Sequence, residues 1–150
     1  MKKIIAIGVS VLIFFSIAFF AINYFYPYYV HWSINRYADE VKEGKINKDN
    51  ITLCSRITYD ETVNSKYISF YIIDENSQKI CFECPDEWRL TDFKYLGFEK
   101  DSKNILVISA DTGTYRYVFN GFSWKEVEVT DSKKYIPDTQ YCIINNLDTE

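Results

Sequence analysis

Residues 105–124 read ILVISADTGTYRYVFNGFSW and contain three extended runs separated by two turns. The run 105–108 is apolar at every position, which is typical of a central strand covered on both faces. Residues 115–119 place aromatic side chains at alternate positions, and Asn-Gly at 120–121 predicts a two-residue type I′ turn into the next strand. The stretch therefore predicts an antiparallel β-meander, with Asp-Thr-Gly at 111–113 as its first turn.

Alternation of apolar and polar residues continues on both sides of this stretch. Strands are predicted at residues 51–59, 67–72, 79–82 and 88–98, with Pro85 as an interruption. After the Asn-Gly turn the apolar positions change register, which predicts a β-bulge near Lys125. Seven or so short strands joined by short turns predict a mainly antiparallel β domain over residues 50–150. It should be sandwich- or barrel-like, and α+β overall with the helix that precedes it.

A short amphipathic helix is predicted over residues 30–44. Its apolar residues recur at helical spacing, charged residues take the other face, and Gly44 is placed to end it. Pro27 predicts a break or kink between this helix and the apolar segment before it. We expect the apolar stripe to pack on the domain's own sheet, with a partner-binding or membrane-surface face as the alternative.

The N-terminal segment, residues 1–26, is predicted to be a transmembrane helix. Residues 4–22 carry no charge, and 13 of these 19 residues are Ile, Leu, Val or Phe. As a helix they would span about 28 Å, close to the ~30 Å hydrocarbon core of a bilayer. A cleaved signal peptide is the alternative, with Ser16-Ile17-Ala18 as a small-x-small site, but the apolar run continues past this site. A retained anchor is therefore expected.

Aromatic residues gather just beyond the apolar run, where a membrane interface is expected. They are Tyr24, Phe25, Tyr26, Tyr28, Tyr29 and Trp32. Lys2 and Lys3 precede the run, whereas the first positive charge after it is Arg36, so the N-terminus should stay in the cytoplasm. The expected localisation is single-pass in the cell (inner) membrane, with the β domain periplasmic or extracellular.

The charge balance excludes one class of partner. Beyond residue 30 the chain holds 15 Lys and Arg against 21 Asp and Glu, a net charge of −6. Binding to nucleic acid needs a basic face, so no nucleic-acid partner is expected. An acidic domain held near a membrane favours a basic protein partner outside the cytoplasm.

The four cysteines are predicted to form two disulfides, because their count is even and the compartment is oxidising. They are Cys54, Cys81, Cys84 and Cys142. The three pairings stay open, with a weak preference for Cys81–Cys84 and Cys54–Cys142. The alternatives are a redox C-x-x-C at residues 81–84 and a zinc site, but the motif ends a strand and stands without a second pair.

Two further features are candidate sites. Asp111-Thr112-Gly113-Thr114 resembles the D-[ST]-G-[ST] core of aspartic proteases, which implies a dimer in which two carboxylates share a proton. The Gly that should follow Cys142-Ile143-Ile144 is Asn145, so a simple turn is favoured. The aromatic residues Trp88, Trp124 and those at 115, 117 and 119 could stack a ligand, but core packing is the commoner use.

These observations predict a binding protein and no enzyme. With a single histidine, His31, no catalytic, metal-binding or cofactor-binding residues are assigned and no cofactor is expected. The expected function is a membrane-anchored interaction domain, inhibitor- or immunity-like. The alternatives are a structural subunit of an envelope complex that contacts its partners through the anchor helix, and an envelope thiol or aspartyl enzyme.

The topology can be tested with a reporter that is active only in the periplasm, fused after Glu150. The fusion should be active and should fractionate with membranes at full length, because the lysines hold the N-terminus inside. A fusion active only in the cytoplasm, or a mature N-terminus at Phe19, would contradict the retained anchor.

Overall fold

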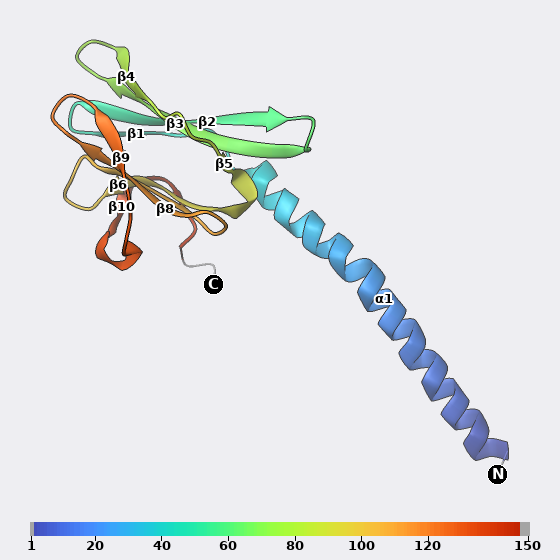
Figure 1. The fold of residues 1–150 in the computed structure, drawn as a ribbon. Helices are drawn as coiled ribbons and strands as arrows, with labels where there is room; N and C mark the ends of the chain where they lie inside the picture. Colours follow the sequence, from blue (N-terminus) through green and yellow to red (C-terminus); the bar gives the residue numbers. More distant parts are fainter. Residues whose placement is uncertain (1, 148–150) are drawn as a thin grey trace. The chain divides into compact units, whose positions relative to one another are not determined.

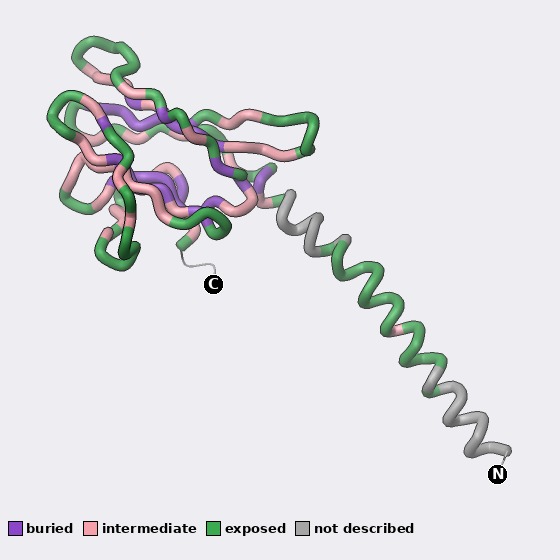
Figure 2. Tube along the Cα trace, viewed as in Figure 1, coloured by how far each residue is buried: buried purple, intermediate pink, exposed green. Residues whose placement is uncertain are grey.

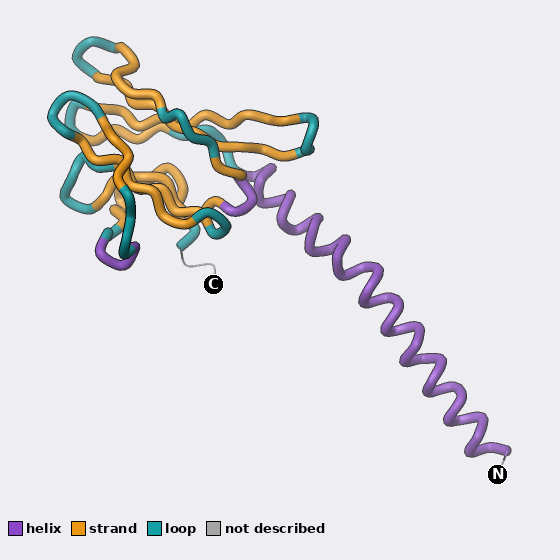
Figure 3. The backbone as a smooth tube through the Cα atoms, in the orientation of Figure 1, coloured by secondary structure: helices purple, strands orange, loops and turns teal. Residues whose placement is uncertain are grey.

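The computed structural model describes residues 2–147, apart from the side chains of residues 2–10, 12, 28 and 30–35. The chain divides into two compact units, Met1–Glu40 and Val41–Glu150. Within the described residues the first unit is one helix, and the second contains ten strands and two short 3-10 helices (Figure 3). All strand pairs are antiparallel, which confirms the prediction of a mainly antiparallel β domain.

Helix α1 (Lys2–Glu40) is continuous through Pro27. The sequence predicted a break or kink at this proline, and the predicted break into two helices is wrong. A proline inside a helix removes one backbone hydrogen bond, so a long helix can continue on both sides of it. Large apolar side chains of α1 that the structure describes, between Val11 and Tyr29, are 49% to 77% exposed. Among the described residues, no helical stretch has both the length and the apolarity needed to cross a membrane.

The helix ends at Glu40 and not at the predicted Gly44, which lies directly before the first strand, β1 (Lys45–Lys48), and is hydrogen-bonded to the neighbouring strand. The Gly44 N–H donates to Ser55 Oγ at 2.8 Å, and its carbonyl accepts from the Ser55 N–H at 3.0 Å. A Cβ at Gly44 would lie 2.5 Å from Ile143 Cγ2, so only glycine allows this close approach. Sheet pairing thus takes the end of the predicted amphipathic helix, and the packing of its apolar stripe stays a prediction.

The first sheet has five strands. They are β1 (Lys45–Lys48), β2 (Ile51–Asp60), β3 (Ser65–Asp74), β4 (Lys79–Glu83) and β5 (Trp88–Arg89). The order is β1-β2-β3-β4, and β5 pairs with β3 beside β4. Pro85 separates β4 from β5, as predicted, and β2 and β3 pair along their full lengths without a register shift. Strand β1 was missed, because four residues rich in lysine give no clear alternation.

The second sheet also has five strands. They are β6 (Phe93–Glu99), β7 (Ile105–Ser109), β8 (Gly113–Phe119), β9 (Trp124–Val127) and β10 (Pro137–Asn145), in the order β10-β6-β7-β8-β9. The apolar β7 is central, as predicted. The predicted extended run 88–98 is interrupted by the 3-10 helix η1 (Leu90–Asp92), which carries the chain from one sheet to the other. A second 3-10 helix, η2 (Ser132–Lys134), precedes β10.

The β8–β9 hairpin is confirmed, but its turn is shifted by one residue. Asn120 and Ser123 are joined by a backbone hydrogen bond, and Gly121 at the first central position has φ +99°, as in type II′ turns. Asn120 is not in the left-handed region, and its side-chain oxygen accepts hydrogen bonds from the N–H groups of Phe122 and Ser123. Residues 116–119 pair with 124–127 without a shift, so the bulge predicted near Lys125 is wrong. Phe122 belongs to the turn and lies outside the strand pattern.

Aromatic side chains fill the space between the two sheets, which form two layers of the β domain (Figure 1). Phe70 of β3 stacks on Trp88 at 6.3 Å between ring centroids and meets Tyr117 of β8 edge-on at 5.1 Å. Phe82 of β4 reaches Trp124 of β9 at 6.0 Å. Phe70, Trp88, Tyr117 and Trp124 are buried. Figure 2 shows buried stretches in both layers of the domain. The aromatic positions of the predicted strands are therefore mainly core positions.

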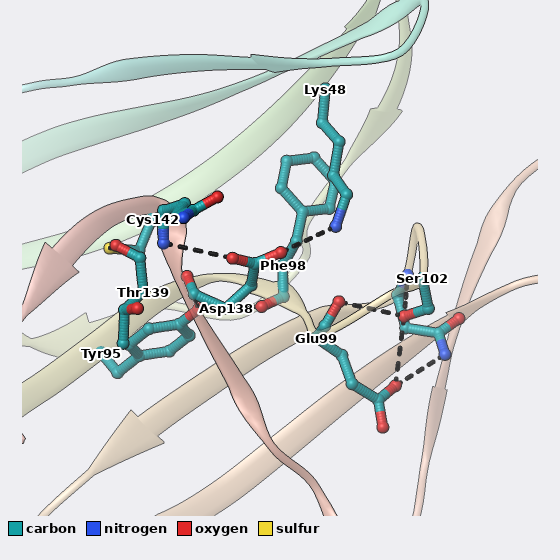
Figure 4. A network of polar contacts seen from close by, with 10 residues as sticks. Lys48, Tyr95, Phe98, Glu99, Ser102, Asp138, Thr139 and Cys142 are labelled. Carbon is teal, nitrogen blue, oxygen red and sulfur yellow. Dashed lines mark hydrogen bonds and ion pairs between the residues drawn. The ribbon is translucent and has the colours of Figure 1, made fainter.

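An ion pair joins β1 to β10 at the edges of the two sheets. Lys48 Nζ lies 3.1 Å from Asp138 Oδ2, and both side chains are about nine-tenths buried, at 13% and 15% exposed. Figure 4 shows the lysine reaching Asp138 beside the Phe98 ring, whose centroid is 5.2 Å from Nζ. Beneath this edge, the Tyr95 hydroxyl donates toward the carbonyl of Phe98 or Asp138, at 2.8 and 3.0 Å.

We expect Asp138→Asn to destabilise the β domain by about 1–3 kcal/mol at pH 7, because it leaves Lys48 buried without its charged partner. Burial raises the pKa of Asp138, but hydrogen bonds from Lys48 and the Gln140 N–H outweigh it, so the pKa is lowered. A lowered pKa stabilises the fold above the ordinary aspartate range, near pH 4, and this stabilisation is lost as the pH falls through the folded value.

The measurement is thermal or urea unfolding of the full-length protein and the variant between pH 3 and pH 7. The difference in unfolding free energy should shrink toward the acid end. Glu61→Gln, in the exposed β2–β3 turn, is the control and should show no such trend. An equal difference at both ends of the pH range would rule out this role of the Asp138 charge.

Candidate functional site

A cleft of about 340 Å³ opens where β5 meets the turn between β7 and β8. Three aromatic residues line it, Tyr67, Trp88 and Tyr115, together with three acidic residues, Asp86, Glu87 and Asp111, and with Arg89 and Thr112. It combines an aromatic wall with convergent polar groups, which is the usual composition of a binding site. The lining carries three carboxylates against one guanidinium, so the cleft is acidic.

The aromatic wall of the cleft is rigid. Trp88 is 4% exposed and opposes Ile68 in the β5–β3 pair, so its position is set by the sheet. Tyr115 meets Trp88 at 5.3 Å between ring centroids, with the ring planes at 63°. Phe93 packs on Trp88 at 6.1 Å. The wall is therefore held before any ligand arrives.

Asp86 is held by the core, while its second oxygen stays available. The Tyr117 hydroxyl donates to Asp86 Oδ2 at 2.8 Å, and the Cys84 thiol donates to the Tyr117 oxygen at 3.3 Å. Within the described part of the chain, the other Asp86 oxygen accepts no hydrogen bond from a side chain. This carboxylate therefore links the aromatic core to the cleft.

Asp111 lies in an exposed turn, as predicted. Its carboxylate accepts a hydrogen bond from Ser109, and Gly113 takes φ +95°, which completes the turn into β8. This geometry matches a β-hairpin turn. No second Asp-Thr-Gly of the described chain lies beside it to supply the paired carboxylate of an aspartic protease. Asp111 and Thr112 line the cleft beside Trp88 and Tyr115, so two features that the sequence presented separately share one site.

The cysteines are free thiols in the structure, so their pairing into disulfides stays a prediction. Cys54 lies in β2 of the first sheet, opposite Tyr71, whereas Cys142 lies in β10 of the second sheet, opposite Gly97. Cys84 is buried against Tyr117, and Cys81 is exposed at the register shift of β4. The C-x-x-C motif therefore presents one accessible thiol and one buried thiol.

The environment of Cys84 opposes thiolate chemistry. Burial raises the pKa of Cys84 to about 11, and burial also raises the pKa of Cys81. The pKa of the Tyr117 hydroxyl is raised as well, first by burial and then by its neighbours Cys84 and Asp86. A nucleophilic or redox cysteine needs a lowered pKa, so this motif lacks the activation that such chemistry requires.

The predicted membrane-interface residues lie in α1. The four whose side chains are described, Tyr24, Phe25, Tyr26 and Tyr29, are 62% to 77% exposed. The side chains of Tyr28, Trp32 and His31 lie outside the described residues. No group of three or more His, Cys, Asp and Glu residues suited to a metal ion occurs in the part of the chain that the structure describes.

A second cleft, of about 400 Å³, lies beside the β1–β10 edge. Its charged lining residues are Lys48, Lys100, Asp101 and Asp138, and the Lys48–Asp138 ion pair is closed within it. Because its best-placed charges already neutralise each other, we regard the acidic cleft as the stronger candidate.

Sequence reasoning missed Tyr67, Asp86 and Glu87 as site residues. They meet Asp111 only because β5 pairs with β3 and the chain then crosses to the other sheet. The one local signal was two acidic residues directly after Pro85, which place charge at a break between strands.

Together the fold and the cleft define a small, two-sheet antiparallel β domain with an acidic cleft lined by aromatic residues. No protein-family model, curated protein or solved structure matches the chain.

We expect N-ethylmaleimide to modify Cys81 in the reduced full-length protein at least about tenfold faster than Cys84. Cys84 is buried, and a pKa near 11 leaves very little thiolate at pH 7. Mass mapping of peptides after timed labelling measures both rates. Equal rates in the folded protein would restore the reactive C-x-x-C hypothesis.

Proposed function

We propose that this protein is a membrane-anchored binding protein whose β domain takes a basic segment of a protein partner outside the cytoplasm. The observation that carries the proposal is the cleft in which three carboxylates and three aromatic rings meet. Carboxylates attract a cationic segment, and aromatic walls supply contact area at little entropic cost. The net charge of −6 beyond residue 30 also attracts a basic partner at long range.

Membrane anchoring is supported by the surface of α1. Large apolar side chains are exposed along its described part, among them Phe14, Phe20 and Ile22. A helix that is apolar all round is normally buried, either in a protein core or in a bilayer. Two lysines before the apolar run and an aromatic cluster after it match the arrangement of a single-pass anchor whose N-terminus is cytoplasmic.

Binding is favoured over catalysis by the state of the two motifs that suggested enzymes. Asp111 sits in a hairpin turn, and its carboxylate accepts a hydrogen bond from the Ser109 hydroxyl. Cys84 is buried with a raised pKa. Neither arrangement supplies an activated nucleophile or a paired acid and base.

A structural subunit that contacts its partners through the anchor helix is the second candidate. The same exposed apolar side chains of α1 favour it, because they could pack on other helices within a membrane. Replacing residues 1–26 by an unrelated membrane anchor separates the two functions. A binding domain keeps its partner after the exchange, whereas a subunit that docks through its helix loses it.

The cleft can be tested with the full-length protein in zwitterionic nanodiscs and a fluorescent decapeptide rich in lysine and arginine. We expect the double variant Glu87→Gln/Asp111→Asn to weaken peptide binding roughly fivefold or more at low salt, because two attractive charges are lost. Fluorescence anisotropy measures the dissociation constant.

The matched control is Glu61→Gln/Glu128→Gln, which changes the net charge equally at two exposed positions that do not line the cleft. It should change binding less than twofold. Equal weakening by both double variants would show that the peptide responds to overall charge alone, and the cleft would lose its assigned function.

A further inference from the structure

We infer that the cleft holds the guanidinium group of an arginine side chain supplied by the partner. This inference rests on the proposed function and names the group that enters the site. Four basic residues of the same β domain share one kind of environment, in which a carboxylate and an aromatic ring lie together beside the cation.

Two arginines of the β domain each contact a carboxylate and an aromatic ring at the same time. The Arg116 guanidinium lies 2.8 Å from Glu99 Oε2 and 4.5 Å from the Tyr135 ring centroid. Arg56 repeats the arrangement on another face, 2.6 Å from a Glu83 oxygen and 5.1 Å from the Tyr71 ring. A carboxylate beside a tyrosine ring is thus an arginine site in this domain.

Two lysines of the β domain have the same two kinds of neighbour, a carboxylate and an aromatic ring. Lys48 pairs with Asp138 and lies 5.2 and 5.0 Å from the Phe98 and Tyr141 rings. Lys103 lies 3.7 Å from Asp49 and 6.0 Å from the Phe119 ring. In each case the ring attracts the cation through its quadrupole while the carboxylate neutralises the charge.

The cleft presents the same two components, but its carboxylates form no ion pair with a basic residue of the described chain. They line the cleft together with the half-buried rings of Tyr67 and Tyr115. One oxygen each of Asp86 and Asp111 is occupied, by Tyr117 and Ser109, and within residues 2–147 no side chain donates to the other oxygen of either. Two acceptor positions and the half-buried Tyr115 ring are therefore available to a ligand in the cleft, while the buried Trp88 ring supports Tyr115 from behind.

The geometry favours arginine over lysine. A guanidinium is planar, so it can stack on a ring while its fork of N–H groups reaches carboxylate oxygens on two sides. Lysine offers a compact point charge without a planar face, so it can approach a ring and a carboxylate but cannot stack on the ring and present a fork of N–H groups to oxygens on two sides. A cleft of about 340 Å³ is also large enough for one long side chain and too small for a folded element.

Arg89 lies at the cleft and must be considered as its occupant. It is exposed, and no carboxylate of the described residues forms an ion pair with it. Its strand position, opposite Tyr67, places it on the rim. If Arg89 competes with an incoming arginine, its removal should tighten binding, and if it does not, binding should stay unchanged.

The test uses the full-length protein labelled with ¹⁵N-tryptophan, in detergent micelles, and three pentapeptides with arginine, lysine or citrulline at the centre. Citrulline keeps the shape of arginine and removes its charge. We expect the arginine peptide to shift the Trp88 indole signal saturably, with at least tenfold weaker binding for citrulline and threefold weaker binding for lysine. The Trp124 indole, which donates to the Lys103 carbonyl at 2.8 Å, should stay unmoved.

Variants then test each component. Tyr115→Leu, which removes the ring, should weaken the arginine peptide several-fold, and Tyr115→Phe, which keeps the ring, should not. Glu87→Gln/Asp111→Asn should also weaken it, whereas Glu61→Gln/Glu128→Gln should leave it unchanged. Arg89→Gln should bind as tightly as the parent or more tightly.

The outcomes separate this inference from the proposed function. If arginine, lysine and citrulline peptides shift Trp88 equally, or if Tyr115→Leu has no effect, the arginine site is wrong. Cleft-dependent binding of the basic decapeptide would still support the proposed function in that case. If the decapeptide itself is insensitive to Glu87→Gln/Asp111→Asn, the proposed function fails and the inference fails with it.

Discussion

The contact of Phe70 with Trp88 and Tyr117 is the interaction on which the rest of the β domain depends. Phe70 belongs to the first sheet and Tyr117 to the second, and their ring centroids are 5.1 Å apart. Trp88 stacks on the same phenylalanine from the neighbouring strand. Each such aromatic pair stabilises by about 0.5–1.5 kcal/mol beyond the area it buries, and together these pairs join the two layers. Because Trp88 is also a wall of the cleft, the packing that holds the sheets together also shapes the site.

A polar pathway runs through this aromatic core to the cleft. The buried Tyr117 hydroxyl needs an acceptor, because an unpaired buried hydroxyl costs about 1–3 kcal/mol. Asp86 provides it at 2.8 Å, and Cys84 donates to the same hydroxyl oxygen. The carboxylate is thereby fixed at the cleft by a requirement of the core. Replacing Asp86 to change which ligand the cleft binds would therefore also leave the buried Tyr117 hydroxyl without its acceptor.

The sequence predicted the strands well where one face of a strand is buried. Leu53, Phe70 and Tyr117 all lie at alternating positions, and all are buried. It failed where a local pattern did not decide the structure. Pro27 did not break α1, Gly44 lies before β1 in close contact with Ile143 and does not end the helix, and the alternation through 88–98 concealed a crossing between sheets at η1.

The candidate site was predictable only in fragments. Asp111, Thr112, Trp88 and Tyr115 were all singled out, but for a protease-like turn and for core packing. Their convergence depends on the pairing of Tyr67 and Ile68 with β5, a contact between strands some 20 residues apart that alternation alone does not specify. Asp86 and Glu87 resembled ordinary solvent-exposed acids because no local pattern distinguishes a charge at a cleft from a charge on a surface.

The proposed anchor compensates for the weak affinity expected of the cleft. A site for one side chain is weak by itself, since an exposed ion pair contributes about 0.2–1 kcal/mol and a cation–π contact about 0.5–2 kcal/mol. Tethering changes this, because two molecules held at one membrane meet at an effective concentration that reaches the millimolar range. A weak cleft then suffices for a partner that is itself confined to that surface, while freely diffusing basic proteins are bound little. On this argument the selectivity comes from where the domain is held as much as from what the cleft contacts, and the partner is expected to be a membrane-associated protein with an accessible arginine.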